Sequence, residues 1–405
     1  MKKKYFNNSK NLTLSEKRKI INCYQRGDIS CFFSKTIKQN ERFFADKIGV
    51  KYAVATSNCT ASLYLAYCTL HIKEDENIIL PNYTHPATIV SAIMANCKIK
   101  LCDCKPNSYD MDINHLEKLI DNKTKAIVFV HLRGLQQNIE EVLSICKKHN
   151  LILIEDVAQG YGVNYNNKIA GTFGDISCFS FNDSKHIKLG EGGMLLTNNP
   201  AFEQEARILL HEGEKSCQEL STTISNGSAE DIVNGNFEYI DKGLNFRPFP
   251  PSFSILENKA IKADKDKYRK FKLCDIYSKF LDKNNFTLFD INDNTNPLYF
   301  PLIAKTANVE DIVSNFYNSN HPIGKMMYTT LNKIKGFSKH IINFNDNFDN
   351  SENLYKQLLF LPLSKNINEK TAKNIALFLN SVIDQKPKQI NDKNEIKNFD
   401  GLFLW

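Results

Sequence analysis

Four short polar segments of the sequence carry side chains that could do chemistry. They are residues 57–62 (SNCTAS), 155–159 (EDVAQ), 180–193 (SFNDSKHIKLGEGG) and 243–247 (GLNFR). The first three follow or end apolar runs that are typical of buried strands. Each segment taken alone also fits an ordinary structural role, such as a helix cap, a solvated lysine or a turn.

The chemical interpretation rests on what each segment offers. Residues 57–62 are expected to open a helix, where free N–H groups and the helix dipole attract an anion, and Thr60 adds a hydroxyl. Asp156 ends a buried strand, a position that suits a catalytic or metal-bound carboxylate and equally a helix cap. Lys185 precedes a glycine-rich turn that lets the backbone pack closely.

Together these groups match the needs of pyridoxal phosphate (PLP). This cofactor requires a lysine for a Schiff base, a carboxylate against its pyridinium nitrogen and an anion cradle for its phosphate. It also requires a flat group stacked on its ring. The four segments therefore predict a PLP site, and no metal site is expected because the His and Cys residues lack ligand spacing.

The elements that must position these residues follow from the hydrophobic pattern. Short runs rich in Val, Ile and Phe predict strands at 52–56, 77–80, 98–103, 125–131, 151–156, 176–181 and 193–197. Helical spacing between them predicts helices at 60–70, 113–120 and 139–148. Strand–helix alternation of this kind predicts an α/β fold with a mainly parallel sheet that binds ligands at the carboxyl ends of its strands.

The pattern changes after this section. Residues 213–242 are polar and predict a long loop, and the proline cluster 247–252 marks a boundary. A helix with many basic residues follows from residue 253, then a smaller α+β section. We expect a large domain over residues 1–250, a small C-terminal domain over 251–385 and a tail over 386–405.

Composition excludes several classes of protein. The chain has 405 residues and a net charge of +7, too mild for a protein that coats nucleic acid. No apolar run approaches the ~18 residues that span a bilayer. Eleven cysteines without Cys-x-x-Cys pairs indicate free thiols in a reducing compartment. We therefore expect a cytoplasmic enzyme with neither nucleic-acid nor membrane partners.

From about residue 12 to 383 the chain resembles the DegT/DnrJ/StrS-type sugar aminotransferases, which have the aspartate-aminotransferase-like fold (type I) of PLP-dependent transferases. The strongest stretch is 151–197, where IEDVAQGYG, GTFGDISCFSF, SK and GEGG stand in the expected order. LPNYTHPAT, VHLRG and LPLSKNINEK support the resemblance.

The resemblance implies a role for each matching residue. Lys185 is the catalytic residue, which holds the cofactor as a Schiff base and then moves a proton. The cofactor-binding residues that it implies, with Lys185, are Thr60, Ala61, His85, Asp156, Gln159, Ser180 and Asn245. Asp156 faces the pyridinium nitrogen, and Asn245 reaches the phosphate of the neighbouring subunit. This arrangement implies a homodimer with active sites at the subunit interface.

Within that set, the phosphate and the ring have separate partners. Thr60, the Ala61 N–H and Ser180 hold the phosphate. Gln159 lies near the ring hydroxyl, and His85 stands where the family usually stacks an aromatic side chain.

The sequence departs from the family at several positions. Cys59 replaces the usual glycine, and it would be strained if that position required a positive φ. Arg133 stands where the family usually has an aromatic, and it suits a phosphate or a carboxylate as well as a surface salt bridge. Residues 327–334 lack the usual Pro-Leu-His pattern. Most of these changes lie where the acceptor would sit.

The resemblance implies an aminotransferase that moves an amino group, with glutamate as the expected donor, to a nucleotide-linked keto-sugar for surface polysaccharide. One alternative is transfer to a small or phosphorylated ketone. Another is a PLP-dependent sugar dehydratase, in which histidine replaces the lysine, so Lys185 argues against it. The last is a non-catalytic regulator, against which Lys185, Asp156 and Gln159 argue.

Overall fold

The computed structural model describes residues 12–214, 239–240, 242–305, 309–317, 322–326, 328–383 and 403–404. Most of the predicted 213–242 loop and of the 386–405 tail therefore lies outside the described residues, as does Cys217. The ten cysteines that the structure describes are free. In the same part of the chain, no helix combines the length and apolar character needed to cross a membrane.

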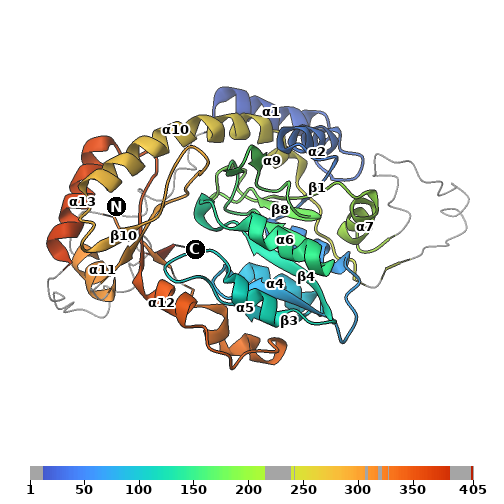
Figure 1. Ribbon diagram of the computed structural model, residues 1–405. Coiled ribbons are helices and arrows are strands. Elements are labelled where there is room, and N and C mark those ends of the chain that lie inside the picture. The colour runs from blue at the N-terminus through green and yellow to red at the C-terminus, as the bar shows by residue number, and fades with distance from the viewer. Residues whose placement is uncertain are drawn as a thin grey trace, which may run out of the picture.

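A seven-stranded sheet forms the centre of the molecule (Figure 1). Its strands, in spatial order, are β1 (Tyr52–Thr56), β9 (Gly193–Thr197), β8 (Ile176–Ser180), β5 (Ile152–Asp156), β4 (Thr124–Val130), β2 (Asn77–Pro81) and β3 (Lys98–Cys102). Of these seven strands, β9 alone runs antiparallel to its neighbours. The predicted strands and the mainly parallel sheet are confirmed, with each strand end within one residue of its expected place.

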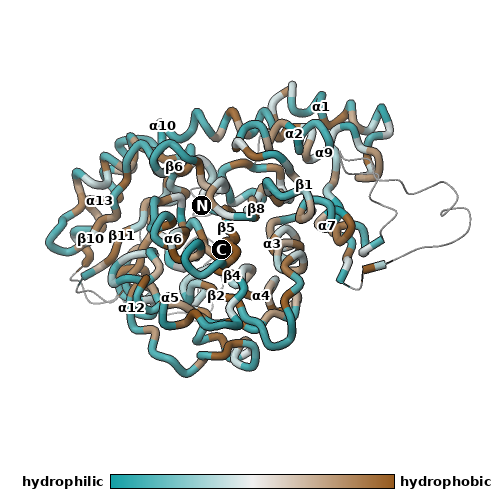
Figure 2. The backbone as a smooth tube through the Cα atoms, turned by 45° about the vertical axis from the view of Figure 1, so that its right-hand side comes forward, coloured by the Kyte–Doolittle hydropathy of each residue, from teal (hydrophilic) through white to brown (hydrophobic). Residues whose placement is uncertain are grey.

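Helices cover both faces of the sheet because successive strand residues point to opposite sides. Val54 faces a core built with α3 (Cys59–Cys68), α4 (Pro86–Met94) and α7 (Pro200–Leu210). Its neighbours Ala53 and Ala55 face the other core, which is built with α2 (Lys35–Ile48), α5 (Ile113–Leu119), α6 (Ile139–His149) and part of α10 (Leu256–Phe280). Figure 2 shows hydrophobic segments on the inner strands and hydrophilic segments on the outer helices. The predicted helices correspond to α3, α5 and α6.

The smaller C-terminal region follows α9 (Pro250–Phe253) and the long helix α10, which connects it to the large part (Figure 1). It holds an antiparallel sheet of β10 (Phe286–Leu288), β11 (Phe300–Ala304) and β13 (Leu358–Leu361), with α11 (Val309–Tyr317) and α13 (Glu369–Val382). This agrees with the predicted α+β section. The remaining elements are α1 (Leu14–Gln25), η2 (Leu132–Gly134), β6 (Asn164–Tyr165), β7 (Lys168–Ile169), η4 (Leu331–Lys333), η5 (Lys335–His340) and α12 (Asp349–Gln357). At the chain end, β14 (Phe403–Leu404) pairs in parallel with β12 (Lys325–Met326).

The chain crosses back from the C-terminal region to the large sheet. The Asn332 N–H donates to Asn82 Oδ1 at 3.0 Å, and the Ile342 N–H donates to the Ile99 carbonyl at 2.8 Å. Residues around η4 and η5 therefore line the β2–β3 edge of the large sheet. The domain boundaries at residues 250 and 385 stay a prediction.

Candidate active site

A cavity of about 350 Å³ opens where β4, β5 and β8 end and where α3 and α4 begin. We call it the strand-end cavity. Six of the eight predicted site residues line it, namely Thr60, His85, Asp156, Gln159, Ser180 and Lys185. Its wall also includes Asn58, Cys59, Leu63, Ala87, Val130, Ala158, Asn182, Ser184, Glu191 and Tyr328. The parallel sheet brings these segments together because the carboxyl ends of its strands share one edge.

Asp156 is a buried carboxylate at the end of β5, with 4% of its surface exposed. Its Oδ1 accepts the Ala158 N–H at 3.1 Å, and its Oδ2 accepts the Thr88 hydroxyl at 2.9 Å. Burial raises the pKa of Asp156 despite these two hydrogen bonds. The sequence left open a cap or a site carboxylate, and this residue caps the following turn and also lines the cavity. A cationic group placed against it would offset the cost of burying its charge.

The preceding residue, Glu155, binds the backbone of the GTFGD segment (residues 171–175). Its buried carboxylate accepts the N–H groups of Gly171, Phe173 and Gly174 at 2.7–2.8 Å. It also lies 2.8 Å from His131 Nε2. Glu155 therefore fixes the loop that follows β7 against the end of β5, which holds the backbone beside Asp156 in place.

Lys185 lies in the turn between β8 and β9 and lines the strand-end cavity. Burial and the nearby charge of Arg133 lower the pKa of Lys185, while Asp156 acts in the opposite direction. A lowered pKa increases the neutral, nucleophilic fraction of the amine. The glycine-rich turn behaves as predicted at Gly193, where a Cβ would clash with the backbone of Asn58. This close approach places the β8–β9 turn against the start of α3.

The start of α3 resolves the doubt about Cys59, since its φ is not positive and the side chain is unstrained there. Asn58 caps the helix, and its Oδ1 accepts the Ala61 N–H at 2.8 Å. Ala61 itself does not line the cavity. The N–H groups of Cys59 and Thr60 lie in the first turn and have no intrahelical partner. The Ala61 N–H is thus already bonded, whereas the first-turn N–H groups of Cys59 and Thr60 can meet an anion.

Gln159 and His85 are held in defined orientations. Gln159 Oε1 accepts the Arg133 backbone N–H at 3.1 Å, which leaves its amide NH₂ group to donate elsewhere. His85 Nδ1 accepts the Ala87 N–H at 3.0 Å, so its proton lies on Nε2, 3.2 Å from the Tyr328 hydroxyl. Burial, with the charges of Lys185 and Arg133, lowers the pKa of His85 to about 4. His85 is therefore neutral at physiological pH.

Asn245 and Arg133 lie outside the lining of the cavity. Asn245 is exposed, and its Oδ1 accepts a hydrogen bond from Arg247 Nε at 2.8 Å. Its proposed contact with a neighbouring subunit stays a prediction.

Arg133 is buried, with only 1% of the residue exposed. The alternative that it forms a surface salt bridge is therefore wrong. Its guanidinium lies over the rings of Phe360 (4.4 Å) and Tyr299 (5.9 Å), where an arginine stacks favourably.

The sequence reasoning did not single out two residues of this site. Thr88 orients Asp156, and Tyr328 contacts His85 and lines the cavity. Thr88 belongs to LPNYTHPAT, and Tyr328 belongs to the segment 327–334 that was noted only as atypical. Both signals were present, but neither indicated which distant residue the side chain would meet.

The assembled site combines three chemical functions. The first turn of α3 with Thr60 and Ser180 can hold an anion. Asp156 can hold a cation, and Lys185 offers an amine of increased nucleophilicity. These functions lie around one cavity whose volume suits a small organic ligand.

Known proteins resemble this chain along most of its length. GDP-perosamine synthase of Caulobacter vibrioides is 35% identical over 199 residues, which are 49% of this chain and 53% of that protein. UDP-4-amino-4,6-dideoxy-N-acetyl-beta-L-altrosamine transaminase of Campylobacter jejuni is 26% identical over 366 residues, 87% of this chain and 91% of that one. The match to the perosamine synthase thus spans about half the length of that relative.

The fold is shared with solved structures. The E. coli GDP-4-keto-6-deoxy-D-mannose-3-dehydratase with bound hydrated PLP superposes with a TM-score of 0.80 at 24% identity, covering 94% of this chain and 99% of that one. The DegT/DnrJ/EryC1/StrS aminotransferase family matches residues 12–380. The family match agrees with the predicted enzyme class, and the solved structure agrees with the predicted fold and cofactor. The chain belongs to the DegT/DnrJ/EryC1/StrS aminotransferase family.

Proposed function

We propose that the protein is a PLP-dependent aminotransferase that moves an amino group from an amino acid to a keto-sugar. The observation that carries this proposal is that Lys185 and Asp156 line the same cavity, next to the N-terminus of α3. These are three of the four groups that PLP requires, and His85, the expected ring partner, lines the same cavity. The family match and the names of its relatives support the same chemistry.

The residues of the strand-end cavity fit the cofactor. Asp156 is buried, carries a raised pKa and would be stabilised by the cationic nitrogen of a pyridinium ring. Thr60 and Ser180 supply hydroxyls where the phosphate would lie, and the Gln159 NH₂ group is free to donate to the ring hydroxyl. When bound, PLP supplies an electron sink for breaking a bond at the substrate's amine-bearing carbon.

Lys185 has two roles in this proposal. Its amine, made more nucleophilic by burial and by Arg133, would hold the cofactor. When released from it, the same nitrogen would move a proton at the substrate carbon. Asp156 would face the ring nitrogen as a carboxylate, which Thr88 and the Ala158 N–H hold in position.

For the substrates, we propose glutamate as donor and a nucleotide-linked keto-sugar as acceptor. The names of the two curated relatives contain GDP- and UDP-linked sugars, which supports a nucleotide-linked acceptor. The same site could serve a phosphorylated ketone without a nucleotide. A panel of acceptors separates the two.

The dehydratase alternative shares this fold, so the fold cannot decide between the two reactions. Lys185 favours transamination, because it lines the strand-end cavity whereas His186 does not. His186 Nε2 instead lies 2.7 Å from the Asn296 carbonyl. The regulator alternative is disfavoured by the presence of Lys185, Asp156 and Gln159 around one cavity.

We also propose a homodimer in which Asn245 of each chain reaches the cofactor phosphate of the other. Asn245 is exposed and lies away from the cavity of its own chain, which suits a contact made across an interface. A closed two-fold dimer gives both sites the same partner contact.

The test begins with the absorbance of the purified holoenzyme. Glutamate should bleach the visible band of the bound cofactor, and borohydride should trap the cofactor on the peptide that contains Lys185. The Lys185→Ala variant should lose both the visible band and the borohydride adduct. The Lys168→Ala variant should keep both, because Lys168 is an exposed residue of β7. Borohydride labelling of Lys168 or Lys188 would contradict the assignment.

The acceptor is then identified in the second half-reaction. Enzyme that carries the amino group is mixed with keto-sugar nucleotides and with small keto-phosphates, and the return of the visible band is timed. Fastest return with a nucleotide-linked sugar supports the proposed acceptor. Fastest return with a keto-phosphate overturns it in favour of the alternative.

A further inference from the structure

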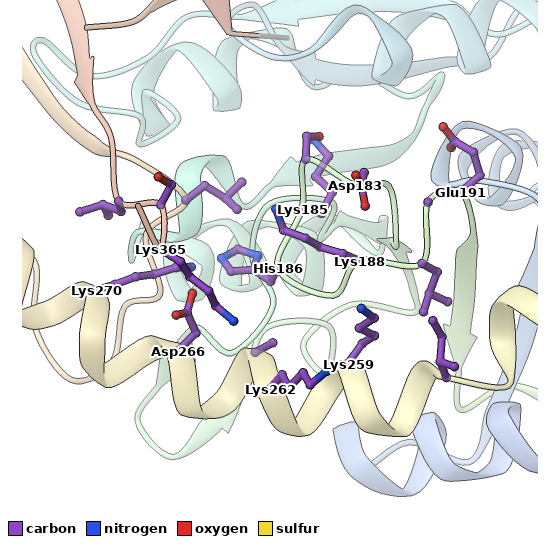
Figure 3. A pocket seen from close by; sticks show the side chains of 18 of the residues that line it. Asp183, Lys185, His186, Lys188, Glu191, Lys259, Lys262, Asp266, Lys270 and Lys365 are labelled. Carbon is purple, nitrogen blue, oxygen red and sulfur yellow. The ribbon is translucent and has the colours of Figure 1, made fainter. Parts of the chain in front are cut away.

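A second cavity of about 840 Å³ lies beside the strand-end cavity. It is enclosed by the 183–191 turn, by one face of α10, and by residues 298–299 and 363–365. Figure 3 shows lysines that approach it from three segments of the chain. We call it the lysine cavity after the six that line it, Lys185, Lys188, Lys259, Lys262, Lys270 and Lys365.

Three of the eight basic residues of α10 line this cavity. Lys259, Lys262, Asp266 and Lys270 follow one another at intervals of three or four residues, so they share one face of the helix. The sequence predicted only a helix rich in basic residues, for which a solvated face is the ordinary expectation. In the structure, this partly buried face lines the cavity opposite Lys188 and His186 (Figure 3).

Only part of this positive charge is paired. Asp183, Glu191 and Asp266 also line the cavity, and the charges of Asp183 and Asp266 act on Lys188. Glu16 of α1 lies 2.7 Å from Lys262 and 3.5 Å from Lys259. Asp266 accepts hydrogen bonds from Arg269 at 2.8 and 3.3 Å. Lys188, Lys270 and Lys365 form no ion pair with a carboxylate among the residues that the structure describes.

Lys270 shows the cost of this arrangement. Only 8% of it is exposed, and its amine lies 3.4 Å from the Asn296 Oδ1 atom. Burial, together with the charges of Arg269 and Lys188, lowers the pKa of Lys270 to about 8, although the charge of Asp266 acts in the opposite direction. Lysine is seldom buried, because its ammonium loses hydration. An anion in the cavity would add a second negative charge to that of Asp266 and offset this cost.

His186 also lines the cavity. Its Nε2 lies against the Asn296 carbonyl, so it carries the proton, and its Nδ1 is buried out of the direct reach of a ligand. The ammonium groups of the lysines are therefore the donors that suit phosphate oxygens.

The two cavities are neighbours that share part of their lining. Ser184, Lys185 and Glu191 line both. A ligand whose reacting carbon lies at Lys185 would therefore have the lysine cavity next to it.

We infer that the lysine cavity binds the phosphate-bearing part of the acceptor, held by Lys188, Lys270 and Lys365. This inference rests on the proposed function, since it assigns a place to the charged part of that acceptor. The shared chemistry is a phosphate or diphosphate oxyanion. A nucleoside diphosphate, a sugar phosphate and inorganic phosphate can each provide it.

Titration calorimetry on the holoenzyme tests the inference, because bound cofactor then fills the anion site at α3. The probes are orthophosphate, pyrophosphate, glucose 1-phosphate, GDP and UDP. Pyrophosphate should bind saturably and more tightly than orthophosphate, since it meets more ammonium groups. Lys270→Gln and Lys188→Gln should each weaken it at least tenfold.

Lys265→Gln is the matched control, because this lysine is exposed on α10 and does not line the cavity. It should change the dissociation constant of pyrophosphate less than twofold. Where Lys270→Gln fails to fold, Lys188→Gln in the partly exposed turn decides the question. Equal weakening by Lys265→Gln, or no saturable binding of pyrophosphate, overturns the inference.

The comparison between probes identifies the source of the phosphate. Tighter binding of GDP or UDP than of pyrophosphate supports a nucleotide-linked ligand, and tighter binding of the sugar phosphate supports a phosphorylated sugar. The Asp156→Asn variant separates this inference from the proposed function, because Asp156 does not line the lysine cavity. This variant should bind pyrophosphate normally while losing turnover. If the wild-type enzyme turns over but its pyrophosphate binding does not depend on the lysines, the inference about the lysine cavity is overturned and the proposed function stands.

Discussion

The hydrogen bond from Thr88 to Asp156 gives a sharp test of how the site is tuned. Replacing Thr88 by valine keeps the shape of the side chain and removes the hydroxyl that donates to Asp156 Oδ2 at 2.9 Å. The Ala158 N–H at 3.1 Å would remain as the other donor. Thr88→Val should therefore leave the fold intact while weakening one support of a buried carboxylate.

The expected magnitude follows from this contact. A buried hydrogen bond to a charged acceptor contributes about 1.5–3 kcal/mol. Removing it destabilises the ionised form, so the pKa of Asp156, already raised by burial, should rise further. If turnover needs the ionised carboxylate, kcat should fall about 10- to 100-fold.

The assay is the rate at which glutamate bleaches the cofactor band, measured across pH. The acidic limb of the rate profile should move to higher pH in Thr88→Val, and Thr88→Ser should restore it. Ser91→Ala is the control, since Ser91 lies on the same helix and donates to the carbonyls of Thr60 and Ala87. An unchanged profile in Thr88→Val, or an equal shift in Ser91→Ala, would refute the reasoning.

Three further predictions follow. His85→Phe should keep turnover within about tenfold, a loss of at most about 1.4 kcal/mol, because His85 is neutral; a collapse to background would mean that its imidazole transfers protons. Burial alone would raise the pKa of Glu16, but hydrogen bonds from Lys262 and Thr13 lower it to about 2 from 4.5. This contribution is present above pH 4.5 and is lost toward pH 2, so Glu16→Gln should lower the free energy of unfolding at pH 7 by about 2–3 kcal/mol. Chemical denaturation at pH 7 and pH 2.5 checks it, and an equal loss at both pH values would count against it. Mixing Lys185→Ala with Asn245→Asp chains should restore up to about half of wild-type activity per mixed dimer, as two-fold symmetry requires; no recovery in exchanged dimers would exclude a shared site.

The sequence by itself determined the elements and the edge at which the chemistry gathers. Apolar runs with period two and helices with period 3.6 are local properties, so the seven strands and helices α3, α5 and α6 could be predicted closely. Because parallel strands present their carboxyl ends at one edge, the polar segments after β1, β5 and β8 had to meet. Asp156 and Lys185 were therefore expected in one cavity, and both line it.

Other parts of the site depended on contacts between distant segments. The sequence was compatible with Arg133 at the surface or in the site. In the structure, its guanidinium is covered by Tyr299 and Phe360 of the C-terminal region. Thr88 meets Asp156 across 68 positions, and Tyr328 meets His85 across 243. Local periodicity contains no information about which of many possible partners packs against a given side chain.

The lysine cavity shows this limit most clearly. The sequence predicted only a helix with many basic residues from residue 253. Only packing of α10 against the Lys188 turn and the segment with Lys365 converts one face of this helix into the wall of a cavity. Charge spacing along a helix is encoded locally, but whether the charges meet water or one another is decided by the tertiary contacts that exclude solvent.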